Sequence, residues 1–311
     1  MSPAEVRAAY LAAAGFERPL AEEVERRGAR VAAWHGRLAL SPDPPVVSAW
    51  ALNAWSECRV ETIASIADAA ARLRALQRNW CAYAPVHHRR AMLIAARLPH
   101  VSAKPLSFPA AAPTAPLGSF TLLDPATLLA SPACTSPFPN GEARFVEDRS
   151  GPPSRAYLKL WEALSRLRRW PGPGETCLDL GAAPGGWSFA LARLGARVIA
   201  VDKAPLDPSV TALPNVTVRR ESAFALDPAR WRRDHGPVDW LCSDVVAYPG
   251  RLLRLVRAWI EADAAARIVC TVKFQGETDH ASADDFAALP GGRLWHLAHN
   301  KHELTFVWAA A

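Results

Sequence analysis

The sequence predicts an α/β protein in which a doubly wound parallel sheet follows a smaller N-terminal α+β domain. Two observations indicate the sheet. Five apolar runs recur at intervals that suit right-handed crossovers, at 176–180, 197–201, 215–219, 238–243 and 267–272. The first run breaks at a glycine-containing turn and continues into an alanine-rich helical pattern. Because such sheets bind ligands at the carboxyl edge of their strands, we expect function there.

Composition limits the class of protein. The 311 residues suffice for two domains, and half of them are hydrophobic, which allows a sizeable core. The net charge of +6 indicates a polyanionic partner, although an inert cationic surface explains the charge equally well. Six cysteines without a Cys-x-x-Cys pair indicate reduced core residues in a cytosolic protein and no metal site. With no signal peptide or long apolar segment, we expect a cytoplasmic protein that does not enter the membrane.

The N-terminal part alternates between helical and extended patterns, which predicts a small α+β domain. Helical periodicity covers 4–28 around a glycine at 15, and a second helix is predicted at 63–76. Strands are predicted at 31–40, 46–55 and 80–83.

A connection rich in proline, alanine and serine follows at 101–153, with short strands predicted at 119–123 and 143–146. We place the domain boundary between 140 and 153, which gives an N-terminal region of 1–150 and a C-terminal domain of 151–311. The C-terminal domain opens with a helix that begins at Ser154 and ends before Pro171.

The turn after the first strand of the C-terminal domain predicts the ligand. It reads Gly181-Ala-Ala-Pro-Gly-Gly and enters a helix at Trp187, so it lacks the Gly-x-Gly-x-x-Gly spacing of dinucleotide-binding proteins. A turn stiffened by Pro184, without a pyrophosphate site, suits an adenosine cofactor that has no phosphates, such as S-adenosylmethionine. Asp202 ends the second strand about 20 residues later, where its carboxylate can accept hydrogen bonds from both ribose hydroxyls.

Lysine is rare in this chain. Of the 36 basic residues 31 are arginines and five are lysines, at 104, 159, 203, 273 and 301. A lysine can lose its proton near neutral pH and an arginine cannot, so a retained lysine suggests such a role. Lys273 directly follows the fifth strand, as Asp244 follows the fourth, and Glu303 stands at the entry of a final strand.

Four of these residues, in order and in local context, resemble a known family. Lys159, Asp244, Lys273 and Glu303 match the Lys-Asp-Lys-Glu tetrad of the FtsJ-type RNA ribose 2′-O-methyltransferases. The family's sequence blocks have counterparts in Ser-Arg-Ala-Tyr-Leu-Lys-Leu from 154, Asp-Leu-Gly-Ala-Ala-Pro-Gly-Gly-Trp from 179 and Val-Lys-Phe-Gln-Gly from 272. Within the family, the chain is most similar to the RlmM group, which methylates a cytidine ribose of 23S rRNA. The resemblance covers roughly 131–311.

The resemblance implies a Rossmann-like class I fold that binds S-adenosylmethionine and a THUMP-like N-terminal region that binds RNA. At the position where the family often has an acid facing the adenine, this chain has Ser222 beside Glu221, and either could face it. The predicted cofactor contacts are Gly181, Ala183, Pro184, Gly185, Gly186, Trp187, Asp202, Ser222 and Asp244.

The chemistry requires a base, because a ribose hydroxyl is a poor nucleophile near pH 7. We assign Lys273 as the base, with Lys159 as a second cation nearby, and Asp244 and Glu303 orienting the two ammonium groups.

The predicted function is 2′-O-methylation of 23S rRNA. Methylation of another RNA such as tRNA, and RNA binding without turnover, remain alternatives. A dinucleotide oxidoreductase is disfavoured by the glycine spacing. The sequence indicates no oligomeric state.

Overall fold

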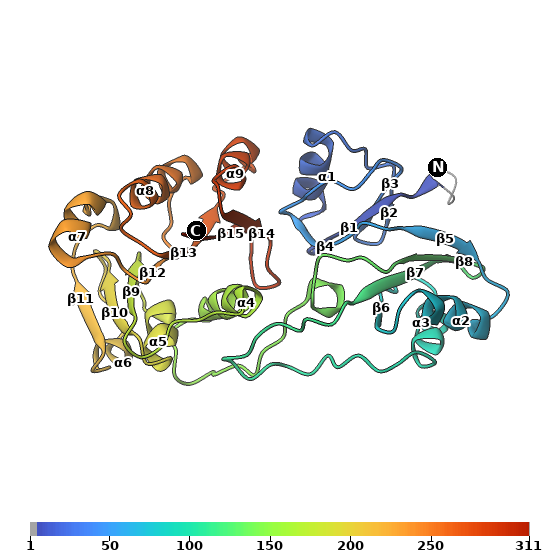
Figure 1. Cartoon of the computed structure of the whole chain (residues 1–311), viewed down its shortest axis with the longest axis horizontal. Coiled ribbons are helices and arrows are strands. Elements are labelled where there is room, and N and C mark those ends of the chain that lie inside the picture. Colours follow the sequence, from blue (N-terminus) through green and yellow to red (C-terminus); the bar gives the residue numbers. More distant parts are fainter. Residues whose placement is uncertain (1–4, 311) are drawn as a thin grey trace. The chain divides into compact units, whose positions relative to one another are not determined.

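The computed structural model describes residues 5–310, and the chain divides into two compact units. The N-terminal unit comprises Met1–Pro105 and Ala112–Arg144, and the C-terminal unit comprises Leu106–Ala111 and Phe145–Ala311 (Figure 1). The main division therefore lies between Arg144 and Phe145. A short segment from the proline-rich connection, Leu106–Ala111, packs with the C-terminal unit, and Leu106 forms a parallel bridge with Phe145 there.

The C-terminal unit is built on a seven-stranded sheet in the order β11-β10-β9-β12-β13-β15-β14. The first five strands in sequence are parallel, and β15 pairs antiparallel with both β13 and β14. The doubly wound α/β prediction is confirmed, with all five predicted strands present. The bounds are β9 Thr176–Leu180, β10 Arg197–Val201, β11 Val216–Arg219, β12 Trp240–Ser243, β13 Arg267–Lys273, β14 Gly292–Trp295 and β15 Glu303–Ala309.

Helices cover both faces of this sheet. In Figure 1, α4 and α5 lie on one face, and α7, α8 and α9 lie on the other. The pattern of α8 shows why it packs there: Leu252, Val256 and Trp259 recur at helical spacing and are buried. The bounds are α4 Tyr157–Leu167, α5 Gly186–Arg193, α6 Pro208–Thr211, α7 Pro228–His235, α8 Pro249–Glu261 and α9 His280–Ala287, with a short 3-10 helix η3 at Ala223–Ala225.

The N-terminal unit begins with a four-stranded antiparallel sheet in the order β2-β3-β1-β4. Helix α1 connects β1 to β2 along the chain. The helix predicted over 4–28 is correct only in its second part, because Ala8–Ala12 forms strand β1. All five residues of β1 are buried between β3 and β4, and a fully buried apolar run has no periodicity that separates strand from helix. The bounds are β1 Ala8–Ala12, α1 Glu17–Arg26, β2 Ala33–His35, β3 Leu38–Ser41 and β4 Ala51–Trp55.

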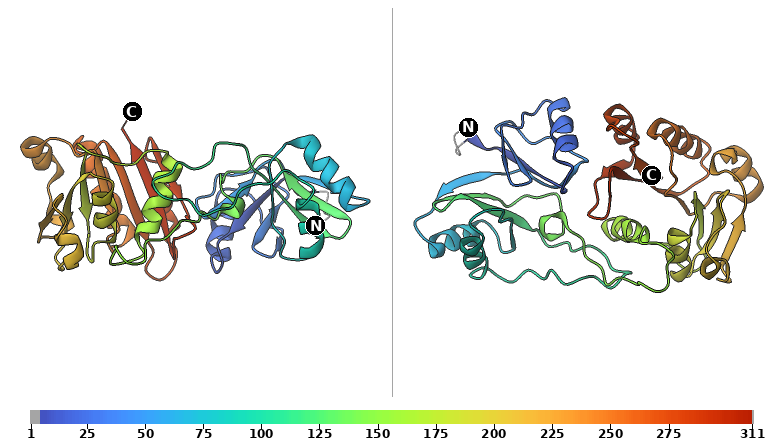
Figure 2. Two further views of the ribbon diagram at one scale, coloured as in Figure 1. Left: turned by 90° about the horizontal axis from the view of Figure 1, so that it is seen from below. Right: turned by 180° about the vertical axis from the view of Figure 1, so that it is seen from behind.

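A second four-stranded sheet, in the order β5-β8-β7-β6, completes the N-terminal unit. Helices α2 and α3 lie side by side against it (Figure 2), and Leu73 and Ile94 from them share a core with Phe120. The strand predicted at 143–146 is absent from the described structure, where only the Phe145 bridge forms. The bounds are β5 Arg59–Thr62, α2 Ile66–Leu76, β6 Trp80–Ala82, α3 His88–Ala95, β7 Gly118–Asp124, β8 Thr127–Ser131 and the 3-10 helix η2 Pro139–Gly141.

The helices of residues 5–310 were also compared with the length and apolar character that a membrane span requires. None of them meets both requirements.

Candidate active site

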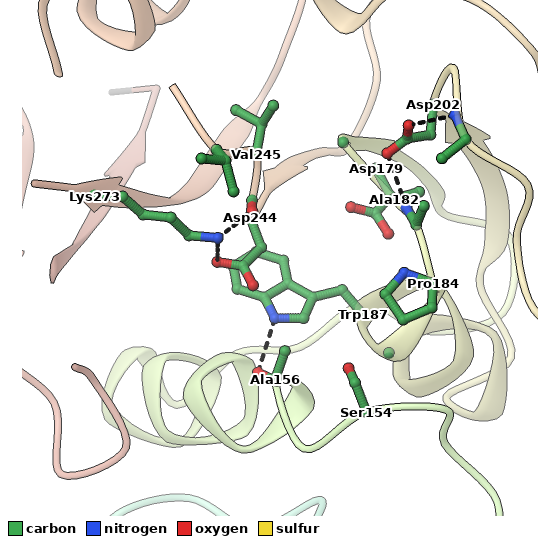
Figure 3. Close-up of a pocket in the computed structure, with 15 residues that line it drawn as sticks. Ser154, Ala156, Asp179, Ala182, Pro184, Trp187, Asp202, Asp244, Val245 and Lys273 are labelled. Atoms are coloured by element: carbon green, nitrogen blue, oxygen red, sulfur yellow. Dashed lines mark hydrogen bonds and ion pairs between the residues drawn. The ribbon is translucent and has the colours of Figure 1, made fainter. Parts of the chain in front are cut away.

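The carboxyl edge of the C-terminal sheet holds a cavity of about 400 Å³ (Figure 3). We call it the acidic cavity, because three aspartates and a single lysine, Lys273, are its charged lining residues. The aspartates are Asp179 in β9, Asp202 after β10 and Asp244 after β12. Parallel strands end at one edge of a sheet, which is why residues far apart in sequence meet here.

The turn between β9 and α5 forms one wall of the acidic cavity. At Gly181 the backbone has φ +77°, and a Cβ added there would lie 2.6 Å from the Cβ of Val245. A Cβ at Gly186 would collide with the Oγ of Ser154. Val245 and Ser154 themselves line the cavity. Because glycine has no Cβ, Val245 and Ser154 can lie close to the backbone of this turn and form part of the cavity wall.

Most of the predicted cofactor contacts lie in the lining of the acidic cavity. Gly185 is not in the lining; it has φ +118°, and a Cβ there would meet Val210. Ser222 and Glu221 are also outside the lining: the Ser222 hydroxyl caps η3 by accepting from the Phe224 N–H, and Glu221 pairs with Arg219. The predicted residues in the lining are Gly181, Ala183, Pro184, Gly186, Trp187, Asp202 and Asp244.

Asp202 is held in place by the turn that it faces. Its Oδ2 accepts a hydrogen bond of 3.0 Å from the Ala183 N–H, and its Oδ1 accepts one of 2.8 Å from the Ala204 N–H. A carboxylate has about four acceptor positions, so each oxygen of Asp202 can accept a further hydrogen bond from a ligand.

Asp179 is a candidate site residue that the sequence analysis did not assign. It is 1% exposed, and its Oδ2 accepts a 2.6 Å hydrogen bond from the Ser188 hydroxyl. Burial raises the pKa of this carboxyl to about 7. The hydrogen bond from Ser188 lowers the pKa, whereas the negative charges of Asp244 and Asp202 raise it further. Its Oδ1 is buried and has no hydrogen-bond partner within the described part of the chain. The sequence signal that could have identified Asp179 is an acidic residue within an otherwise apolar predicted strand.

These features fit S-adenosylmethionine. A buried acceptor without a protein partner suits a ligand that donates hydrogen bonds, and three carboxylates suit a ligand that carries a sulfonium and an ammonium group. Asp202 offers acceptors for ribose hydroxyls. The acidic cavity can therefore hold this cofactor with residues of this chain alone.

Beside the acidic cavity, the structure brings together Lys159, Asp244, Lys273 and Glu303. The Nζ of Lys159 lies 2.9 Å from Asp244 Oδ1 and 3.0 Å from Glu303 Oε1. The Nζ of Lys273 lies 3.0 Å from the same Oδ1 of Asp244 (Figure 3) and also donates to the Asp244 carbonyl. These contacts join α4, the ends of β12 and β13, and the start of β15.

The two lysines differ in their surroundings. Lys159 has a side chain 9% exposed, whereas that of Lys273 is 20% exposed. Burial by itself would lower the pKa of Lys159, but the carboxylates of Asp244 and Glu303 together outweigh it, so the pKa is raised. Lys159 is therefore a fixed cation near neutral pH, and Lys273 shares its counterion Asp244 with it.

Two further residues support this cluster without having been predicted. The Asn300 amide donates to Glu303 Oε1 over 3.3 Å, and its oxygen accepts from the Leu297 N–H. Glu162 in α4 is fully buried and accepts from Arg166 and from the Ala298 N–H. Glu162 thus ties the helix that carries Lys159 to the turn that precedes Glu303.

A second cavity of about 440 Å³ adjoins the first, with Lys273 and Ala156 lining both. We call it the basic cavity, because its charged lining residues are Arg155, Lys159, Lys273, Lys301 and Glu303. His299 lines it as well. Among residues 5–310 no group of histidine, cysteine and acidic side chains has a geometry that could hold a metal ion.

Comparisons of the sequence with known proteins find one family and several relatives. Residues 152–279 match the family described as FtsJ-like methyltransferase. Three curated relatives are each named ribosomal RNA large subunit methyltransferase M. The relative from Halorhodospira halophila is 40% identical over 54% of this chain and 50% of its own length. The relative from Methylococcus capsulatus is 42% identical over 44% of this chain and 38% of its own length.

The third relative, from Alkalilimnicola ehrlichii, is 36% identical over 56% of this chain and 51% of its own length. The chain thus matches about half the length of these curated relatives, or less. The match to the FtsJ-like family includes Lys159, Asp202, Asp244 and Lys273, whereas Glu303 lies beyond it.

Proposed function

We propose that this chain, whose residues 152–279 match the FtsJ-like methyltransferase family, transfers a methyl group from S-adenosylmethionine to a ribose 2′-oxygen of RNA. The observation that carries the proposal is the contact of Lys273 with Asp244 at the wall between an acidic and a basic cavity. One cavity suits a cationic cofactor and the other a polyanionic acceptor.

The residues of the acidic cavity would bind the cofactor. Asp202 would accept from the ribose hydroxyls, and Asp179 would accept from a donor on the cofactor. S-adenosylmethionine supplies a methyl group on a sulfonium, and its transfer to oxygen leaves a neutral thioether. The turn of Gly181 and Pro184 closes the cavity on the side of α5.

Lys273 would act as the general base. Its neutral amine takes the proton of the 2′-hydroxyl as the oxygen bonds to the methyl carbon, and the product is an ammonium group that Asp244 stabilises. Lys159 stays charged, because the carboxylates of Asp244 and Glu303 raise its pKa. Glu303 and Asp244 fix the position of Lys159. Arginine in place of Lys273 would remain protonated and could not accept the proton.

The proposed substrate is 23S rRNA, with a cytidine ribose as the acceptor. The name of the curated relatives, ribosomal RNA large subunit methyltransferase M, supports the large-subunit rRNA, whereas the cytidine rests on the sequence resemblance to the RlmM group. A net charge of +6 suits a polyanionic partner. We further propose that the N-terminal unit, with its two four-stranded sheets, guides the RNA to the site.

The test is incubation of the protein with labelled S-adenosylmethionine and RNA from a strain that lacks the modification. We expect the label on a ribose 2′-oxygen of 23S rRNA and none with Lys273→Ala. Label on tRNA alone would replace the substrate assignment. Label on a base would refute 2′-O-transfer. Normal incorporation by Lys273→Ala would show that another group is the base.

A further inference from the structure

The two adjoining cavities have opposite charge. The charged groups that line the acidic cavity are the carboxyl groups of Asp179, Asp202 and Asp244 and the single ammonium group of Lys273. In the basic cavity the single carboxylate of Glu303 faces four cations, from Arg155, Lys159, Lys273 and Lys301. A sulfonium compound is therefore favoured on one side of Lys273 and a phosphate-bearing ligand on the other.

The basic cavity also concentrates a rare residue. The whole chain has five lysines, and three of them, Lys159, Lys273 and Lys301, line this cavity. The proposed reaction gives functions to Lys159 and Lys273 but none to Lys301. The proposed reaction therefore does not explain why a lysine stands at position 301.

The cations of the basic cavity differ in their availability to a ligand. Lys159 and Lys273 are engaged with Asp244, and Arg155 contacts Glu147 over 2.7 Å. Lys301 is exposed, and no carboxylate of the described chain forms an ion pair with it. Among residues 5–310 it is the cation of this cavity that has no carboxylate partner.

The backbone of Lys301 is nevertheless held firmly. Its N–H donates to Glu303 Oε1 over 3.3 Å, and its carbonyl oxygen lies 3.0 Å from Nε2 of His296, a residue 1% exposed. Glu303 in turn binds Lys159. The backbone of Lys301 is thus anchored to the pair of Lys159 and Glu303, which keeps its exposed side chain at the basic cavity.

We propose that the basic cavity seats the acceptor nucleotide of the RNA and that Lys301 binds a backbone phosphate next to the methylated ribose. The inference rests on the proposed function and adds the phosphate-binding residue to it. The phosphate contact sets which sugar reaches Lys273, because the ribose and its phosphate are joined at a short, fixed distance. Arg155, at the same cavity, would contribute a second and weaker contact, since it is shared with Glu147.

The test measures binding separately from catalysis. The probe is a fluorescent 23S rRNA fragment that contains the mapped site, and its anisotropy gives Kd between about 0.05 and 0.2 M salt. We expect Lys301→Ala to weaken binding about threefold to tenfold and to reduce the slope of log Kd against log salt by about one. Lys301→Arg should retain the affinity and slope, because the charge is kept. Methylation by Lys301→Ala should show a raised KM for RNA and a nearly unchanged kcat.

Two controls separate the failure of this inference from failure of the proposed function. Arg230→Ala removes an exposed cation of α7 in the C-terminal unit, outside the lining of both cavities, and should change the affinity less than Lys301→Ala. Binding of S-adenosylmethionine, measured by calorimetry, should be equal in both variants. If Lys301→Ala binds the fragment with wild-type affinity and salt slope while the wild type methylates it, the phosphate assignment is wrong and the function stands. If the wild type methylates no RNA, the proposed function fails, and Lys301→Ala still reports whether the cavity binds a polyanion.

Discussion

Lys273 and Glu303 stand directly opposite one another, as the last residue of β13 and the first residue of β15 in their antiparallel register. A slip by one residue would turn one of the two side chains to the other face of the sheet. The pairing continues through Arg267 and Ala309, so the register is fixed by the whole length of both strands. Lys159 then joins the pair from α4, through Glu303 and Asp244.

Replacement of the proposed base should separate charge from proton transfer. We expect Lys273→Ala and Lys273→Arg each to lower kcat by at least about 100-fold, because neither side chain can accept the hydroxyl proton. Affinity for S-adenosylmethionine, measured by calorimetry, should change only a few-fold. Activity of Lys273→Arg above a tenth of wild type would contradict the assignment.

Loss of Lys159 should affect stability as well as activity. Lys159→Ala leaves the carboxylates of Asp244 and Glu303 without their shared cation, and we expect the free energy of unfolding to fall by about 3 kcal/mol. Urea denaturation measures this change. The double variant Lys159→Met with Glu303→Gln should regain part of the stability but none of the activity. A fully stable Lys159→Ala protein would mean that the cluster contributes little to folding.

Asp179 should make stability depend on pH. Its pKa in the folded protein, about 7, lies above the ordinary value of 3.8, so between these values the folded state binds more protons than the unfolded state. Stability is therefore greatest below about pH 4 for this group and falls as the pH rises through 7, by a few kcal/mol in all.

The variant Asp179→Asn removes this titration. We expect the stability difference between pH 5 and pH 8, measured by urea denaturation, to be smaller in Asp179→Asn than in the wild type. Asp207→Asn is the control, because this carboxyl has a lowered pKa, caused mainly by its hydrogen bonds from Ser209. Equal pH dependence in wild type and Asp179→Asn would show that Asp179 is ionised throughout this range.

Two glycines with similar backbone angles allow a matched test of the cavity wall. Gly181 has φ +77° and Gly174 has φ +87°, but only a Cβ at 181 meets Val245, and nothing lies within 4 Å of a Cβ at 174. Gly174→Ala should cost about 1 kcal/mol of stability through its backbone, and Gly181→Ala about 1–3 kcal/mol more. Only Gly181→Ala should weaken S-adenosylmethionine binding. Adding Val245→Ala should restore part of it; similar losses at both glycines would rule out the packing explanation.

The sheet strands of the C-terminal unit could be predicted because their signals are local. Each is an apolar run ended by a turn residue, such as Leu180 before Gly181 or Val201 before Asp202, and these boundaries agree with the structure. β1 could not be separated from a helix, because Ala8–Ala12 is buried on both faces and its neighbours β3 and β4 come later in the chain. The membership of Leu106–Ala111 in the C-terminal unit likewise depends on a distant partner, Phe145.

For the site, the sequence by itself determined which residues follow the strands and which of them carry ammonium or carboxylate groups. The resemblance to the FtsJ-type methyltransferases identified four candidate catalytic residues, namely Lys159, Asp244, Lys273 and Glu303. Only the tertiary structure decided that they touch, that Asp179 faces the same cavity without a partner for Oδ1, and that Lys301 lines a second, basic cavity. The reason is physical: local patterns record the preferences of a short segment, whereas strand register joins Lys273 to Glu303 and helix packing joins Lys159 to Glu303, residues that are distant along the chain.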